Sequence, residues 1–150
     1  MVDVVSAEIR SRMMAGIRGK NTRPEMRLRR FLHKAGFRYR LHDRSLPGTP
    51  DVVLPRYRTA ILIHGCFWHR HANCRFATTP ATNAEFWKRK FSCNVERDSL
   101  AVEKLLSEGW RVIVVWECGL KSAAAEQSLD WLPGYISNGS ARFLEWPITT

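Results

Sequence analysis

The 150-residue sequence contains no apolar run that approaches the about 20 residues needed to cross a bilayer, and it does not open with a charged leader and an apolar segment. It also has no internal repeat and no low-complexity linker. These absences argue against a membrane protein and favour one compact domain, which we expect to be soluble and cytoplasmic. An apolar content of 45% argues against global disorder.

Acidic residues are scarce in the first third of the chain. Residues 1–44 hold 12 Lys/Arg against 4 Asp/Glu, whereas residues 45–150 hold 12 against 10, so most of the net charge of +10 lies at the front. Such a block attracts polyanions through its field and through counterion release, and we expect nucleic acid rather than an anionic membrane surface as the partner. A merely solvated basic surface is the alternative. Residues 1–20 are predicted to form a basic arm or helix that precedes the main domain, residues 21–150.

The spacing of apolar residues predicts an α/β domain. A capping-box pattern at Thr22 and Glu25 indicates the start of a helix, and Gly36 indicates its end. The other predicted elements are strands over residues 37–41, 51–54 and 59–64, a helix over 83–108, a strand over 111–116, and a last helix over 122–132 stopped by Pro133-Gly134. This order predicts a mixed central sheet with helices on both faces.

The segment that follows the strand at 59–64 is rich in metal donors. Two thiols and two imidazoles occur within nine positions, at Cys66, His69, His71 and Cys74. A loop with C-x₄-H-x₂-C supplies three of the four ligands of a closed tetrahedral zinc site. Cys118, just past the strand at 111–116, is a better candidate for the fourth ligand than Cys93 inside a helix. Ordinary core cysteines are the alternative, and we expect no disulfides in a cytosolic protein.

Asp51 stands at the start of a predicted strand, after a turn that ends in Pro50. This layout is that of restriction-type nucleases, in which the carboxylate binds Mg²⁺ that polarises the scissile phosphate and activates water. A Pro-Asp pair is also common in ordinary turns. The next strand of such nucleases normally carries an acidic residue and a lysine, but Leu62 and His64 stand there. A histidine-assisted variant of the chemistry is therefore required.

Aromatic residues form the third signal. Phe67 and Trp68 are adjacent in the segment that holds the metal donors, and two large neighbouring rings cannot both point into a core. At least one is expected to project outward, where it can stack on bases or wedge between them. Phe86 is expected to lie in the core, and Trp87 either in the core or at the surface.

These residues make the chain resemble the Vsr (very short patch repair) mismatch endonuclease family. The resemblance covers about residues 9–120 and is carried by several blocks in order: Met14 to Thr22, Pro24-Glu25, Leu46 to Asp51, His64 to His69, Phe86-Trp87, Asn94 with Arg97-Asp98, and Gly109-Trp110 to Cys118. It implies a restriction-endonuclease-like fold with a structural zinc site. The implied activity is Mg²⁺-dependent nicking of one strand 5′ of the thymine in T·G mismatches that arise from 5-methylcytosine deamination.

The resemblance also implies roles for individual residues. Asp51 would bind Mg²⁺ directly, together with the backbone carbonyl of Ile63, and Glu25 would act behind them. His69 would be the general base, while His64 and Asp98 would order water and phosphate. Zn²⁺ would be held by Cys66, His71, Cys74 and Cys118. The residues implied in DNA contact are Phe67, Trp68 and Trp87 as a wedge from the major groove, Met14 and Ile17 from the other side, and Lys90 and Asn94 as base contacts.

One departure from the family affects the zinc loop. Two residues, Ala72-Asn73, separate His71 from Cys74 where the family more often has one. A zinc loop tolerates this length, but the neighbouring aromatic wedge would be displaced, which bears on the sequence context that is recognised.

Two other functions fit parts of the same pattern. The first is a restriction-like nuclease that cuts both strands at an unmodified site, and the second is a zinc-stabilised DNA-binding module without catalysis. The occurrence of Asp51, His64, His69 and Asp98 together argues against a pure binding module. We expect a monomer that acts on mismatched double-stranded DNA in the bacterial cytoplasm, at the nucleoid and away from membranes, together with mismatch-repair and short-patch resynthesis proteins.

Overall fold

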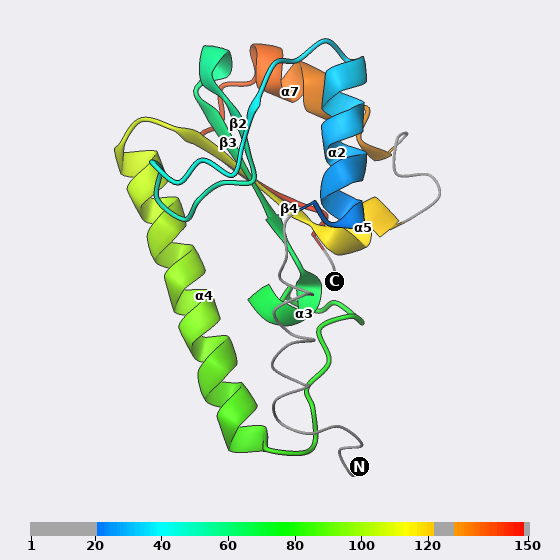
Figure 1. Cartoon of the computed structure of the whole chain (residues 1–150), viewed down its shortest axis with the longest axis vertical. Helices are drawn as coiled ribbons and strands as arrows, with labels where there is room; N and C mark the ends of the chain where they lie inside the picture. Colours follow the sequence, from blue (N-terminus) through cyan, green and yellow to red (C-terminus); the bar gives the residue numbers. More distant parts are fainter. Residues whose placement is uncertain (1–20, 122–127, 149–150) are drawn as a thin grey trace.

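The computed structural model describes residues 21–121 and 128–148, and the predicted basic arm, with Met14 and Ile17, lies outside these ranges. Five strands form one sheet in the order β1-β2-β3-β4-β5. Their bounds are Arg40–Leu41 for β1, Val52–Leu54 for β2, Thr59–His64 for β3, Arg111–Trp116 for β4 and Phe143–Trp146 for β5. The described helices are α2 (Arg23–Lys34), α3 (Cys66–His69), α4 (Ala84–Ser107), α5 (Glu117–Lys121) and α7 (Leu132–Asn138), with a 3₁₀ turn, η1, at Pro55–Tyr57 (Figure 1).

The sheet is mixed, as the sequence predicts. The pairs β1-β2 and β2-β3 are antiparallel, whereas β3-β4 and β4-β5 are parallel. A parallel pair needs a long crossover, and the segment that contains α3 and α4 provides it between β3 and β4. The register of this pair sets His64 opposite Trp116. The end of β3 and the end of β4 therefore lie side by side, together with the residues that follow each of them.

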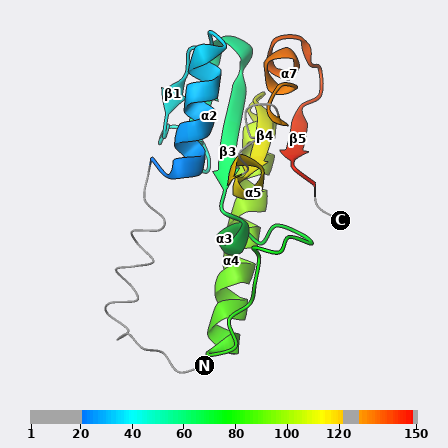
Figure 2. The ribbon, with the colours of Figure 1, turned by 90° about the vertical axis from the view of Figure 1, so that its right-hand side faces the viewer.

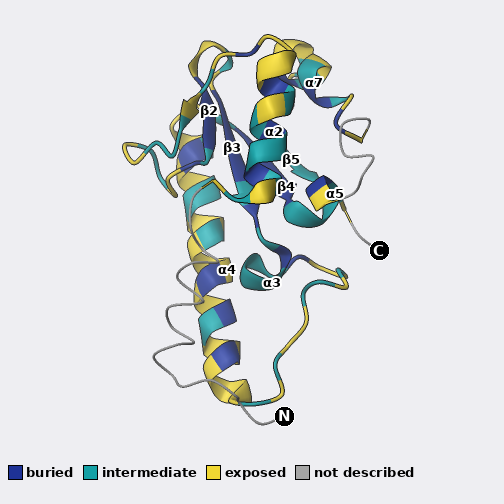
Figure 3. Cartoon of the chain, turned by 45° about the vertical axis from the view of Figure 1, so that its right-hand side comes forward, coloured by how far each residue is buried: buried dark blue, intermediate teal, exposed yellow. Residues whose placement is uncertain are grey.

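Alternation along β3 and β4 divides the core into two layers. Ile61 and Ile113 point to one face, where they pack with Leu28 and Leu32 of α2 and with Ile136 of α7. The intervening residues point to the other face, where Leu62 and Val114 pack with Leu105 of α4. The sheet is thus buried on both sides, which explains the nearly continuous apolar sequence of its central strands (Figures 2 and 3).

Helix α4 is longer than the sheet that it covers. Its last turns pack on β4, and its first half runs beyond the sheet, where the short helix α3 packs against it (Figure 1). The elements that carry the predicted site residues meet in this region. No helix in the described ranges is long and apolar enough to cross a membrane.

The start of α2 confirms half of the predicted capping box. The Thr22 hydroxyl accepts a hydrogen bond from the backbone N–H of Glu25 at 3.4 Å, and Pro24 occupies the first turn. The Glu25 side chain does not complete the box, because its carboxylate bonds to Arg29 and His42 instead. Glu25 is almost fully buried, so this carboxylate belongs to the interior rather than to the helix end.

The C-terminal part differs from the prediction. Pro133-Gly134 do not stop a helix but lie in the first turn of α7. A proline is tolerated there because the first N–H groups of a helix have no partner within it, so the missing N–H of proline costs no hydrogen bond. Residues 122–127 of the predicted last helix lie outside the described ranges. Strand β5 was not predicted, because four residues at the edge of the sheet give only a weak alternation signal. The strand predicted over residues 37–41 is shortened to Arg40–Leu41.

Candidate active site and metal centres

Among the described residues, three groups of potential metal ligands lie at or just beyond one end of the sheet. Their ligand atoms are within 4.8 Å of one another in each group, and the groups are Glu25, His42 and Asp51; His64, His69 and Asp98; and Cys66, His71, Cys74 and Cys118. The antiparallel pairing of β2 with β3 brings the start of one strand to the end of the other. Residues that are distant in the sequence are thereby collected in one region.

Asp51 is held at the start of β2 by its neighbour in β3. Its Oδ2 accepts a hydrogen bond of 2.7 Å from the backbone N–H of Ile63. Burial, assisted by the nearby Glu25 charge, raises the pKa of the Asp51 carboxyl to about 6, although the hydrogen bond from Ile63 and the imidazoles of His42 and His69 lower it. A carboxylate that is costly to ionise in its own surroundings is well suited to bind a cation.

Glu25 reaches the same region from α2. Its two carboxylate oxygens each lie 3.0 Å from Nε2 of His42, and Oε2 also receives Nη1 of Arg29 at 3.1 Å. His42 is fixed by its backbone as well, because its N–H donates to the carbonyl of Asp51 at 3.1 Å. The sequence interpretation missed His42, since only the pairing of β1 with β2 brings it beside Glu25 and Asp51.

His69 and Asp98 form an oriented pair between α3 and α4. His69 Nδ1 lies 2.6 Å from Asp98 Oδ2, and the two side chains are 30% and 22% exposed. With Nδ1–H donating to the carboxylate, the free lone pair of His69 is on Nε2. The His69 ring stacks on His64 with centroids 4.1 Å apart and planes 9° apart. Burial lowers the pKa of His64 to about 3, with His69 adding to the effect, so His64 is neutral at pH 7.

The Cys/His group is assembled as the sequence predicts. Cys118 follows β4 in α5 and meets Cys66, which follows β3, whereas Cys93 lies exposed on α4. The His71 Nδ1 atom is 3.7 Å from Cys66 Sγ and 3.5 Å from Cys118 Sγ. Burial raises the pKa of the Cys66 and Cys118 thiols, and a cation would oppose this by stabilising the thiolates. The group has the donors of a closed tetrahedral site.

His71 is oriented by partners that the sequence interpretation did not find. Its second nitrogen, Nε2, lies 2.8 Å from the carbonyl oxygen of Pro147, and its ring stacks on Trp116 with centroids 4.3 Å apart. Trp116 in turn packs edge-on against His64 and donates through Nε1 to Glu145 of β5. A hydrogen bond to a carbonyl fixes the tautomer of a histidine ligand, and the residue that follows β5 supplies that bond here.

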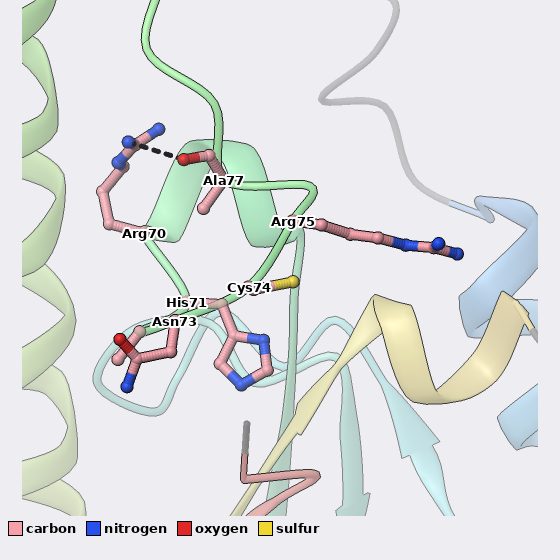
Figure 4. Close-up of a pocket in the computed structure, with 7 residues that line it drawn as sticks. Arg70, His71, Asn73, Cys74, Arg75 and Ala77 are labelled. Carbon is pink, nitrogen blue, oxygen red and sulfur yellow. Dashed lines mark hydrogen bonds between the residues drawn. The ribbon is translucent and has the colours of Figure 1, made fainter. Parts of the chain in front are cut away.

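The loop over this group is fastened by Arg70. Its guanidinium donates to the carbonyls of Ala77 and Thr78 at 2.9 and 2.8 Å and lies 4.0 Å from the centroid of Phe91. A pocket of about 570 Å³ lies on this loop, with Arg70 and Arg75 on opposite sides of it (Figure 4). Asn73 takes the left-handed conformation, with φ of 57°, which asparagine tolerates. The longer loop thus closes without disturbing the three ligands.

The aromatic side chains of α3 and α4 form one cluster. Phe67 contacts the rings of Trp68, Trp87 and Phe91 at centroid distances of 4.9 to 5.6 Å. Phe67 and Trp68 are half-buried, whereas Trp87 is 4% exposed. The prediction that Phe86 lies in the core is wrong, because its side chain is 52% exposed. Helical geometry turns adjacent residues to different sides, and α4 gives its inner side to Trp87.

The two predicted base contacts on α4 differ in accessibility. Lys90 is half-buried. Asn94 is 5% exposed, and its Nδ2 donates to the backbone carbonyl of Trp68 at 3.0 Å. This bond ties α4 to α3 just behind the aromatic cluster. Base contact by either residue stays a prediction.

A carboxylate and histidine group next to a separate Cys/His group, on a mixed α/β sheet, has the donor sets that metal-dependent enzymes use. Comparison with known proteins narrows this class. The sequence model of the family described as DNA mismatch endonuclease Vsr matches residues 2–75. The chain is 42% identical over 141 residues to DNA mismatch endonuclease Vsr of Escherichia coli, with 89% of this chain and 90% of that protein covered.

Two further relatives are described as nicking enzymes. The type II nicking enzyme V.XorIIP of Xanthomonas oryzae is 46% identical over 125 residues, with 83% of this chain and 91% of that protein covered. The type II nicking enzyme V.NmeAIP of Neisseria meningitidis is 44% identical over 124 residues, with 83% and 88% covered. The chain belongs to the Vsr DNA mismatch endonuclease family, which confirms the resemblance.

Proposed function

We propose that the protein is a DNA mismatch endonuclease that nicks one strand 5′ of the thymine in a T·G mismatch left by 5-methylcytosine deamination. The observation that carries the proposal is that the half-buried Asp51 carboxylate lies close enough to His69 for the imidazole to affect its pKa, while Asp98 orients the same imidazole. This places a carboxylate able to bind a cation near a candidate base. Family membership supplies the substrate. We infer a restriction-endonuclease-like fold on the same grounds.

The donors around Asp51 suit Mg²⁺, which prefers carboxylate and carbonyl oxygens. Asp51 and the carbonyl of Ile63 would hold the ion. Glu25 would lie one layer further out and would not bind the ion directly. In an extended strand the N–H and C=O of one residue point to the same side, and Ile63 directs its N–H at Asp51. This orientation supports the Ile63 carbonyl as a ligand. When bound, the cation would polarise the scissile phosphate and lower the pKa of the attacking water.

The protein's own side chains would handle the proton and the phosphate. Asp98 holds His69 so that Nε2 faces outward as an acceptor, and the 30% exposure of the His69 side chain leaves it accessible to a water molecule. His69 would take the proton of that water as general base. The stacked ring of His64 restricts rotation of His69, and His64 would order water and phosphate, while Asp98 would act on them through His69.

The Cys/His group is proposed to hold one structural Zn²⁺. Four protein ligands would leave no open position, so the ion would stabilise the segment that carries His69 rather than take part in the reaction. Cys118→Ser should remove most of the zinc and lower the melting temperature, because metal binding is coupled to folding. The measurement is zinc content per chain, with about one equivalent expected in the parent.

Cys93→Ser is the matched control for this zinc prediction, because Cys93 is an exposed cysteine of α4 outside the group. It should keep the zinc content and the melting temperature of the parent. An unchanged zinc content in folded Cys118→Ser protein would show that Cys118 is not a ligand.

DNA contact is proposed for the aromatic cluster and the basic front of the chain. Phe67 and Trp68 would wedge beside the mismatch from the major groove, supported by Trp87, with Lys90 and Asn94 toward the bases. Met14 and Ile17, outside the described residues, would approach from the other side. The partner is double-stranded DNA bound by a monomer in the cytoplasm, at the nucleoid, and mismatch-repair and short-patch resynthesis proteins would act on the nick.

Trp68→Ala is expected to reduce the preference for T·G over T·A duplex roughly tenfold or more while the fold is kept, because a mismatched step costs less to unstack. The ratio of kcat/KM on the two duplexes measures this. Phe143→Ala removes an exposed ring from β5, far from the cluster, and should leave the ratio unchanged. Equal discrimination by Trp68→Ala and the parent would assign Trp68 to packing alone.

The proposed function is tested by incubating the zinc-loaded protein and Mg²⁺ with covalently closed circular DNA that contains one T·G mismatch. A nicked circle with its new end 5′ of the mismatched thymine is expected, and the same circle with a T·A pair should stay closed. A linear product would instead indicate a nuclease that cuts both strands, and binding without cleavage would indicate a DNA-binding module. Circles with varied bases beside the mismatch would define the context.

A further inference from the structure

His42 is in the Asp51 region, but neither the sequence motifs nor the proposed reaction gives it a task. Its Nε2 lies 3.0 Å from both carboxylate oxygens of Glu25, and a ligand atom of Asp51 is within 4.8 Å of it. The side chains of His42 and Glu25 are 14% and 4% exposed. An imidazole is thus enclosed with two carboxylates, which is a mixed nitrogen and oxygen donor set.

The distances fit a shared cation. In an octahedral site with bonds of about 2.1 Å, adjacent ligands lie about 3.0 Å apart and opposite ligands about 4.2 Å apart, and the ligand atoms of His42 and Asp51 lie within 4.8 Å of each other. The Cys/His group follows the same rule, because its 3.5 and 3.7 Å separations from nitrogen to sulfur match the edge of a tetrahedron with bonds of about 2.0–2.3 Å. The Cys/His group has the spacing of ligands around an ion, and the donors of the Asp51 group lie within the same 4.8 Å limit.

The backbone holds His42 in this position. Its N–H donates to the Asp51 carbonyl, and the pair Leu41 and Val52 next to it is aligned in the β1-β2 ladder. His42 has a φ of 47°, a conformation that non-glycine residues adopt rarely. The turn out of β1 therefore points the ring at Glu25 and Asp51 through fixed main-chain contacts. Arg29 pairs with Glu25 at 3.1 Å, and no Lys or Arg among the described residues forms an ion pair with Asp51, so a dication at Asp51 would supply the missing positive charge.

We propose that His42 is a nitrogen ligand of the divalent cation held at Asp51, so that the centre binds Mn²⁺ and Co²⁺ more tightly than Mg²⁺. Imidazole suits transition-metal ions, whereas Mg²⁺ prefers oxygen and retains its water. The proposal rests on the proposed function in one respect, the cation at Asp51. It adds a ligand and an ion preference to that centre.

Pulsed electron paramagnetic resonance of Mn²⁺ tests the ligand directly, in the full-length zinc-loaded protein. A ¹⁴N coupling to bound Mn²⁺ is expected, and protein labelled with ¹⁵N-histidine should show the ¹⁵N coupling in its place. His42→Asn should abolish the coupling, and asparagine tolerates the left-handed backbone at this position. His33→Asn, an exposed histidine at the end of α2, is the matched control and should retain it.

A second variant keeps the test decisive if His42→Asn does not fold. The double variant His64→Asn, His69→Asn removes the other histidines near Asp51, and it must retain the histidine nitrogen coupling if His42 is the ligand. Loss of the coupling in the double variant, or its survival in folded His42→Asn protein, overturns the proposal. Bound Mn²⁺ without any nitrogen coupling does so too, and His42 would then only donate a hydrogen bond to Glu25.

Affinities give an independent readout. In the parent, Mn²⁺ should bind at least about tenfold more tightly than Mg²⁺, and His42→Asn should weaken Mn²⁺ binding by a similar factor with little change for Mg²⁺. An equal loss for both ions would overturn the proposal. Asp51→Asn tests the cation at Asp51 separately from the role of His42. If it leaves Mn²⁺ binding intact, the cation is not held at Asp51 and the proposed function loses its centre, whatever His42 does.

Discussion

Asp51→Asn is expected to abolish nicking of T·G circles in Mg²⁺ while leaving binding to the same DNA almost unchanged. Asparagine keeps the shape of the side chain and can still accept the hydrogen bond from the Ile63 N–H. What it loses is the charge that is proposed to bind the cation. Because metal-ion catalysis contributes several kcal/mol to the transition state, the rate should fall by about 10³-fold or more. Single-turnover nicking and a DNA-binding titration measure the two effects separately.

The melting temperature distinguishes a loss of catalysis in Asp51→Asn from misfolding of the variant. Burial raises the pKa of Asp51 to about 6, so the parent carries the ionised side chain at pH 7 at a cost to the folded state. A raised pKa stabilises the folded state below the unfolded pKa, and that contribution is lost as the pH rises through about 6. The neutral variant avoids the cost. At pH 7 and without added Mg²⁺, its melting temperature should equal or exceed that of the parent.

Asp130→Asn is the matched control, because Asp130 is an exposed aspartate away from the site. It should nick at the parental rate. Folded Asp51→Asn protein that nicks at a rate close to the parental one would show that the reaction takes place elsewhere.

The centre of the fold is predictable because its signals are local and strong. The apolar runs of β3 and β4 indicate buried strands, and once two such strands pair in parallel their ends coincide. That is why Cys118 could be matched with Cys66 before the structure was known. The number of residues between Cys66 and Cys118 does not by itself indicate that the two lie close together. The parallel register that sets His64 opposite Trp116 brings the two cysteines together.

The parts that sequence reasoning missed depend on tertiary packing. His42 comes beside Glu25 only through the hairpin of β1 and β2, and β1 is two residues long. Pro147 reaches His71 only because β5 joins the sheet edge. The assignment of Phe86 to the core and Trp87 to either environment depended on which side of α4 faces α3. Periodicity cannot decide this for two adjacent aromatic residues.

His69→Ala is expected to lower the nicking rate by about 10²–10⁴-fold, with a much smaller effect on DNA affinity. The reason is geometric. Nδ1 of His69 lies 2.6 Å from Asp98, so Nε2 is the atom left to accept a proton from water. His69→Ala removes that acceptor, whereas the cation at Asp51 would remain bound. This variant should therefore retain Mn²⁺ binding, unlike Asp51→Asn.

Asp98→Asn tests how His69 is oriented without removing its ring. The amide can accept a hydrogen bond through its oxygen, but it can also donate through its nitrogen, which would favour the tautomer with the proton on Nε2. It also removes the charge that stabilises the imidazolium formed when His69 takes a proton. We expect a fall in rate of about 10²-fold, smaller than that of His69→Ala, with unchanged KM.

Glu96→Gln is the control for Asp98→Asn, because it removes an exposed carboxylate from the same helix two residues earlier. It should change neither kcat nor KM, which excludes a general effect of charge on α4. The double variant His69→Ala, Asp98→Asn should be no slower than His69→Ala alone, because Asp98 acts through His69 and has nothing to orient once the ring is gone. Additive losses in the double variant would instead show that Asp98 acts on water or phosphate independently of His69.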